Sequence, residues 1–103
     1  MKIWVDDIRP TPDYSYDVRC MSTNKAIEKI SKCGRGETLI LDLDHDAGDF
    51  FYDGGDYIKI LDWLEQWDRK GELDIKVHIH SWNPVGRQNM ERICKRNGWE
   101  VLM

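Results

Sequence analysis

The chain has 103 residues, a size that fits one domain with one hydrophobic core and excludes a two-domain enzyme. Its 19 acidic and 15 basic residues give a net charge of −4, which argues against a protein that binds duplex DNA by charge alone. No apolar run is as long as a membrane span, and Met1 leads into a strand-like segment without a signal-peptide pattern. We therefore expect one cytoplasmic domain over residues 1–103 that does not bind a membrane.

Hydrophobic periodicity predicts alternating strands and helices along the chain. Strands are expected over residues 2–5, 16–21, 38–43, 75–80 and 99–102, and helices over residues 23–33, 57–70 and 87–97. Gly34, Gly71 and Gly98 stand where left-handed C-terminal caps would end the three helices. The number of cysteines is odd and their spacing is wide, at Cys20, Cys33 and Cys94. This pattern favours reduced packing residues over a metal or disulfide site.

Strands that alternate with helices predict a parallel sheet with right-handed crossovers. The fold class is therefore α/β, a receiver-like (flavodoxin-like) three-layer fold with a short parallel sheet. Only about ten residues join the first two strands, whereas a helical crossover needs a dozen or more. The first helix is accordingly expected to be missing or reduced to a loop.

Polar side chains follow three of the predicted strands, at the point where each strand ends. The first group is Asp6 and Asp7, the second is residues 44–46, and the third is residues 80–83. Because the carboxyl ends of parallel strands meet at one edge of the sheet, these groups are expected to form a common site.

The acidic residues of this edge predict a cation site. Carboxylates held close together repel one another unless a cation lies among them, and oxygen ligands favour Mg²⁺ or another hard divalent ion. Asp6, Asp7 and Asp44 are the expected metal ligands. The alternative is that Asp6 and Asp46 cap turns or pair with Arg9 and Arg87.

The histidines of the edge are candidates for acid–base chemistry. His45 and His80 could act as base and acid in phosphoester cleavage, and either Asp44 or Asp46 could orient His45. His78 is interpreted as a core or edge residue, although a His-x-His zinc site with His80 remains an alternative.

The turn at residues 83–86 and several aromatic residues complete the expected site. Pro84 and Gly86 predict a strand-to-helix turn whose free N–H groups could bind phosphate. The aromatic candidates for stacking a base are Tyr14, Phe50, Phe51, Tyr52 and Trp82. For the two phenylalanines, packing of the loop is the favoured interpretation.

The motifs at residues 5–10 (VDDIRP), 43–46 (LDHD) and 80–90 (HSWNPVGRQNM) together resemble the cyclic-phosphate processing receiver-like domain family. The resemblance implies a receiver fold without its first helix and hydrolysis of 2′,3′-cyclic phosphate ends of RNA, or of cyclic nucleotides, in RNA repair or processing. It implies catalytic residues His45, His80 and Asp46, metal ligands Asp6, Asp7 and Asp44, and phosphate contacts from Ser81, Asn83, Gly86 and Arg9. Asp42 and His78 depart from the family pattern.

Two other functions stay open. A signalling receiver would accept phosphate on Asp42, but the chain lacks the lysine at the end of the last strand and the final helix that such domains use. A non-catalytic module that binds phosphate-bearing ends or nucleotides is the second alternative.

Overall fold

The structure is a computed structural model that describes residues 1–103. Five strands, three α-helices and two short 3₁₀ helices follow one another along the chain. In chain order they are β1 (Lys2–Val5), β2 (Val18–Cys20), α1 (Thr23–Ile30), β3 (Thr38–Leu43), η1 (Gly48–Phe50), α2 (Ile58–Gln66), η2 (Lys70–Glu72), β4 (Asp74–Ile79), α3 (Pro84–Asn97) and β5 (Glu100–Leu102).

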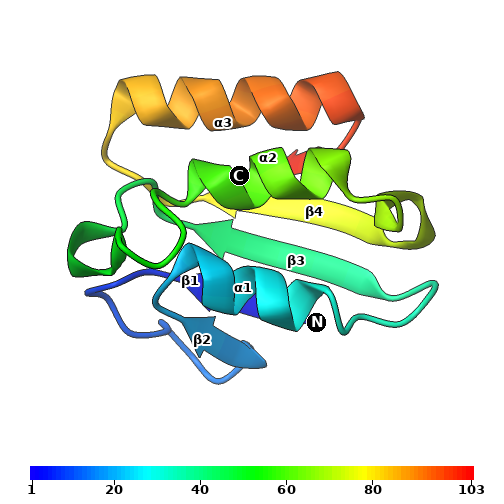
Figure 1. Cartoon of the computed structure of the whole chain (residues 1–103), viewed down its shortest axis with the longest axis horizontal. Helices are drawn as coiled ribbons and strands as arrows, with labels where there is room; N and C mark the ends of the chain where they lie inside the picture. Colours follow the sequence, from blue (N-terminus) through cyan, green and yellow to red (C-terminus); the bar gives the residue numbers. More distant parts are fainter.

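The strands form one sheet in the order β2-β1-β3-β4-β5, and every neighbouring pair is parallel. This arrangement confirms the predicted α/β, receiver-like fold with a short parallel sheet, but the helices cover only one face, so the fold has two layers rather than the expected three. The register aligns Val5 with Leu43 and Leu43 with Ile79. The last residues of β1, β3 and β4 therefore lie side by side, and the segments that follow them leave the sheet at the same edge, on the left in Figure 1.

The three helices lie on one face of the sheet. The chain steps in one direction from β2 through β3 and β4 to β5, so right-handed crossovers place α1, α2 and α3 on the same side (Figure 1). Inward side chains of β1, β3 and β4 pack against this helical layer, and they include Ile3, Leu41 and Val77, all fully buried.

The opposite face of the sheet has no helix. The chain from β1 to β2 runs through a loop, residues 6–17, where a receiver would place its first helix. This loop confirms the predicted loss of that helix. It covers part of the face near Trp4, whose ring lies 5.3 Å from the ring of Tyr16 and whose residue is 7% exposed.

Helix ends differ from the sequence prediction in three places. Helix α3 begins at Pro84 rather than at residue 87. Asn83 caps this start, because its Oδ1 accepts the N–H of Gly86. Proline is tolerated at the first helical position, because the N–H that it lacks has no partner within a helix there. Gly98 caps α3 with φ of 73°, as predicted. Gly34 and Gly71 do not adopt left-handed conformations, and α1 ends earlier, at Ile30.

Two further expectations concern the cysteines and the membrane. Cys20, Cys33 and Cys94 are free and buried, which confirms their assignment as packing residues. None of the helices combines the length and the apolar character that crossing a bilayer requires.

Candidate functional site

The structure brings the polar groups of three strand ends together. Asp6 follows β1, Asp44 follows β3 and His80 follows β4, and ligand atoms of these three side chains lie within 4.8 Å of one another. The register explains this convergence, since β1, β3 and β4 end at the same level of the sheet. The predicted meeting of distant chain segments at one edge therefore holds for these three residues.

His80 is held by carboxylates at both of its ring nitrogens. Nε2 lies 2.9 Å from Asp6 Oδ2, and Nδ1 lies 2.6 Å from Asp42 Oδ1. The Trp4 ring stacks on the imidazole at 4.0 Å, and only 9% of the His80 side chain is exposed. Burial by itself lowers the pKa of His80, but the hydrogen bonds to Asp42 and Asp6 and their charges outweigh it and raise the pKa. His80 is thus a fixed group with no free nitrogen.

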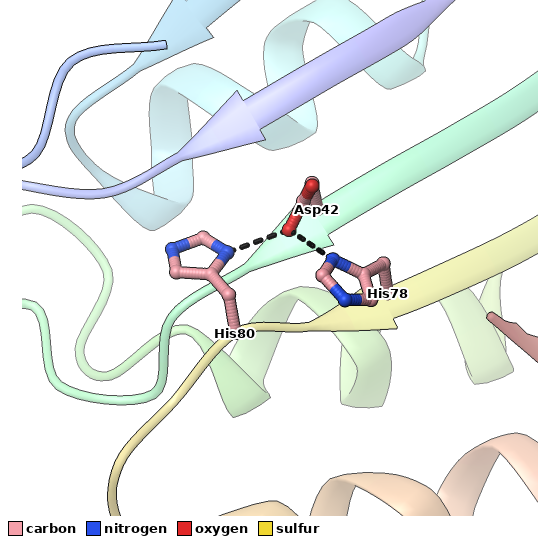
Figure 2. A group of neighbouring side chains, drawn as sticks. All are labelled: Asp42, His78 and His80. Carbon is pink, nitrogen blue, oxygen red and sulfur yellow. Dashed lines mark hydrogen bonds and ion pairs between the residues drawn. The ribbon is translucent and has the colours of Figure 1, made fainter. Parts of the chain in front are cut away.

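Asp42 joins His80 to residues on the face that lacks helices (Figure 2). Its Oδ1 also lies 2.9 Å from Nδ1 of His78, and its Oδ2 accepts the hydroxyl of Tyr16 at 2.6 Å. Burial alone would raise the pKa of Asp42, yet these partners hold the pKa below its ordinary value. The sequence interpretation of His78 as a core or edge residue missed this contact. The sequence feature that could have indicated this contact is the two-residue spacing of positions 78 and 80, because side chains two apart in extended chain lie on the same face.

His45 forms a different kind of pair. Its Nδ1 lies 2.8 Å from Asp46 Oδ1, its side chain is 15% exposed, and no side chain or backbone group of the protein hydrogen-bonds Nε2. The ring lies against Gly86 so closely that a Cβ there would be 2.5 Å from His45 Cδ2. Gly86 therefore makes room for the histidine.

Asp6 is satisfied by the local backbone. Its Oδ1 accepts the N–H groups of Ile8 and Arg9, each at 2.8 Å, and Arg9 Nε lies 3.7 Å from Oδ2. Burial alone raises the pKa of Asp6, while these N–H groups and His80 lower it. The alternative reading of Asp6, as a turn residue that pairs with Arg9, therefore describes part of its environment.

The surroundings of Asp7 act in the other direction. Burial raises its pKa, and the charges of Asp6, Asp44 and Asp49 raise it further, against the lowering effect of a hydrogen bond from its own N–H. Gly48, with φ of +55°, packs against it, and a Cβ on that glycine would overlap Asp7 Oδ2. Asp6, Asp7 and Asp44 offer only oxygen atoms, the donors that a hard divalent ion such as Mg²⁺ prefers. Ligand atoms of Asp6 and Asp44 lie within 4.8 Å of one another together with His80, whereas Asp7 belongs to none of the groups this close.

The predicted phosphate-binding residues mostly serve the start of α3. Ser81 Oγ accepts the N–H of Asn83, and Asn83 Oδ1 accepts the N–H of Gly86. Of the N–H groups that this turn was expected to leave free, that of Gly86 is capped by Asn83. Arg87 donates to the carbonyl of Ile79 and to Glu91, rather than pairing with Asp46.

A cavity of about 340 Å³ lies beside the edge, between β2, α1 and η1. Its lining combines cations, aromatic rings and small polar groups: Arg19, Cys20, Met21, Ser22, Lys25, Lys29, Phe50, Tyr52 and Asp53. Arg19 connects the cavity to the edge, because its Nη2 donates to the carbonyl of Asp6 at 3.3 Å. Nε of the same guanidinium is buried without a partner. Sequence reasoning did not identify these cations.

The aromatic residues divide between this cavity and open solvent. The Phe50 and Tyr52 rings stack with centroids 6.4 Å apart, and both line the cavity. Phe51 is 60% exposed, so the expectation that both phenylalanines pack the loop is wrong for this residue. Tyr14 and Trp82 are largely exposed.

Comparisons with known proteins give one match. The family model described as the cyclic-phosphate processing receiver domain matches residues 1–96. No curated protein and no solved structure matches the chain.

Proposed function

Because the chain belongs to the cyclic-phosphate processing receiver domain family, we propose that it hydrolyses a 2′,3′-cyclic phosphate at an RNA end or in a nucleotide. The observation that carries this proposal is the His45–Asp46 pair, in which one imidazole nitrogen is oriented by a carboxylate and the other is free. A histidine held in this way is the usual general base of hydrolytic sites.

His45 moves the proton in the proposed reaction. Nε2 accepts a proton from the attacking water as the new P–O bond forms. One ester bond between phosphorus and a ribose oxygen breaks, and the protonated His45 returns the proton to that leaving oxygen. The products are a free hydroxyl and a phosphomonoester, so the reaction consumes only water. Asp46 keeps Nδ1 protonated and the ring oriented.

His80 has a positioning role rather than a share in proton transfer. Both of its nitrogens face carboxylates, so it has no lone pair for water and no proton that a leaving group can reach. This differs from the sequence expectation that His45 and His80 act as base and acid. By bonding Asp6 and Asp42, His80 links the β1 end to the neighbouring strands.

Asp7 and Asp44, with Asp6, are the residues that would hold a divalent cation. Their oxygen-only donors and the neighbouring negative charges that raise the pKa of Asp7 support this assignment. A bound Mg²⁺ would neutralise negative charge on the non-bridging phosphate oxygens.

The cavity beside the edge supports a nucleotide substrate. Arg19, Lys25 and Lys29 supply positive charge for a phosphate, and the paired rings of Phe50 and Tyr52 supply apolar faces for a base. The overall charge is −4, so this local group of cations is the part of the surface suited to an RNA end.

Phosphorelay through Asp42 receives no support from the geometry. Only 5% of the Asp42 side chain is exposed, and both oxygens already bond to Tyr16, His78 or His80. Asp44, rather than Asp42, is the first residue after β3 and stands beside Asp6.

Turnover of a 2′,3′-cyclic nucleotide, measured with and without Mg²⁺, tests the proposal. The parent protein should release a nucleoside monophosphate, and His45→Gln should lower kcat by about 10²–10⁴-fold, the usual contribution of a general base. Lys95→Gln, on the far part of α3, is the matched control and should leave kcat unchanged. Binding of the nucleotide without turnover by the parent would instead favour a non-catalytic module.

A further inference from the structure

The sheet face without helices carries a cluster of three possible metal ligands, of which one, His80, also belongs to the carboxyl edge. Asp42 on β3 is aligned with His78 on the neighbouring strand β4, and His80 follows the end of β4 (Figure 2). Their ligand atoms all lie within 4.8 Å of one another. Both Nδ1 atoms point at the same oxygen, Asp42 Oδ1, at 2.9 and 2.6 Å.

We propose that Asp42, His78 and His80 bind a divalent first-row transition-metal ion of the Zn²⁺ class. Imidazole nitrogen and carboxylate oxygen are the ligands that such ions prefer, and three protein ligands are typical of sites that keep a further position open. Ligand atoms around a tetrahedral ion are roughly 3.3 Å apart, given metal–ligand bonds of about 2.0–2.1 Å. The two distances from the histidine nitrogens to Asp42 Oδ1 need to lengthen by less than about 1 Å to reach that spacing.

The residues that contact these three ligands resemble those that hydrogen-bond and orient the ligands of known metal sites. His80 presents Nε2 to Asp6 Oδ2 at 2.9 Å, and a carboxylate at the second nitrogen fixes the tautomer in which Nδ1 binds the ion. The Tyr16 hydroxyl bonds Asp42 Oδ2 and leaves Oδ1 turned toward the two histidines. The Trp4 ring stacked on His80 fixes the plane of the imidazole.

An open coordination position faces a cavity of about 210 Å³ on the same side of the sheet. Asp42 and His78 line it together with Lys2, Tyr16 and Ile40. The His78 side chain is 35% exposed, so an ion reaches it from solvent without unfolding of the sheet. This access exists because residues 6–17 form a loop instead of a helix over that face.

The cluster is chemically different from the carboxylates of the edge. Asp7 and Asp44 offer oxygen atoms alone, whereas the cluster on the open face adds two imidazole nitrogens. Softer nitrogen ligands select Zn²⁺ or Co²⁺ over Mg²⁺. The two groups meet at His80, whose Nδ1 faces Asp42 and whose Nε2 faces Asp6 at the edge.

Titration of the chelator-treated protein with Zn²⁺ by calorimetry, and with Co²⁺ by visible absorption, tests the proposal. The parent is expected to bind one equivalent, and the Co²⁺ form should show the intense bands of a four-coordinate ion. His78→Gln should weaken binding by more than about 100-fold, beyond the 10–100-fold loss that follows removal of an outer contact. Tyr16→Phe, which removes such a contact, should weaken it by about tenfold.

Asp7→Asn and His45→Gln are the matched controls, since each removes a possible ligand elsewhere on the edge and should leave Zn²⁺ affinity unchanged. Circular dichroism of every variant checks that the fold is retained. Absence of saturable binding by the parent, equal affinity in the folded His78→Gln protein, or displacement of Co²⁺ by an equimolar amount of Mg²⁺ would each overturn the proposal. The readout is binding, so the result does not depend on whether the protein hydrolyses a cyclic phosphate.

Discussion

Two histidines follow neighbouring strands of the sheet, and each is paired with aspartate, yet their surroundings are opposite. His45 touches one carboxylate, Asp46, whose side chain is 65% exposed, and keeps its second nitrogen free. His80 lies between two carboxylates that are 1% and 5% exposed and has both nitrogens occupied. The first arrangement can exchange a proton with a bound molecule. The second arrangement ties strands together.

This difference shows that a histidine at a strand end does not by itself mark a catalytic group. Desolvation makes each lost contact of the buried group costly, while the exposed pair is screened by water and contributes little to stability. We therefore expect mutations in the two groups to have separate effects: on folding for the buried group and on turnover for the exposed pair.

The largest expected effect comes from removing the shared carboxylate of the buried group. Asp42→Ala leaves Tyr16, His78 and His80 without their acceptor and should lower the free energy of unfolding by about 3 kcal/mol, as for other broken buried ion pairs. Asp46→Ala, at the exposed pair, should lower it by less than about 1 kcal/mol. Urea denaturation of both proteins measures the difference, and similar losses would contradict the contrast.

Gly86→Ala disturbs the exposed pair without touching either of its members. The new Cβ would lie 2.5 Å from His45 Cδ2 and 2.8 Å from Nε2, so the ring has to move away from Asp46. We expect a loss of stability of about 2 kcal/mol, typical of overpacking, together with loss of turnover of the cyclic nucleotide. Gly71→Ala is the matched control, because a Cβ there meets nothing within 4 Å. Full activity of Gly86→Ala would show that the position of His45 is unimportant.

The sequence was sufficient for the fold because the relevant signals are local. Apolar runs and helical spacing located every strand and α-helix, and the short link after β1 predicted the missing helix. Helix ends were harder. Gly34 and Gly71 look like caps in the sequence, but Gly34 lies in the loop after α1 and Gly71 within η2, and neither has a left-handed φ. The early start of α3 depends on a side-chain hydrogen bond from Asn83 that periodicity does not contain.

The sequence predicted which residues meet at the edge, but not which acid each histidine contacts. Strand order alone brings Asp6, Asp44 and His80 to one edge. Which acid each histidine contacts depends on register: Asp42 and His78 are aligned across β3 and β4, and that alignment places Asp42 beside His80. Arg19 was not predicted as a site residue, because the cavity that it lines is formed by segments distant in sequence.

Tyr16→Phe removes a single hydrogen bond from the buried group and leaves the His45–Asp46 pair intact. The Tyr16 hydroxyl donates to Asp42 Oδ2 at 2.6 Å, and burial, with that bond, raises the pKa of Tyr16 well above its ordinary value. Loss of a hydrogen bond to a buried charge should lower the free energy of unfolding by about 1.5 kcal/mol. Turnover should not change, since His45 and Asp46 are untouched. A large drop in kcat would mean that the buried group takes part in the reaction.

The smallest expected effect is a pH dependence of stability in the chelator-treated protein. The pKa of His80 is raised in the folded state, because its bonds to Asp42 and Asp6 outweigh the opposing effect of burial. A raised pKa means that the folded protein binds the proton more tightly than the unfolded chain. The stabilisation is therefore complete below the ordinary histidine pKa and disappears as the pH rises through the raised value.

Urea midpoints measured at a series of pH values should thus fall for the parent as the pH rises from the ordinary histidine pKa through the raised value of His80. The decline should be absent in His80→Gln, which has no proton to lose at that position. If the decline instead persists unchanged in His80→Gln, then the buried group does not hold its proton more tightly in the folded protein, and the role assigned to His80 is wrong.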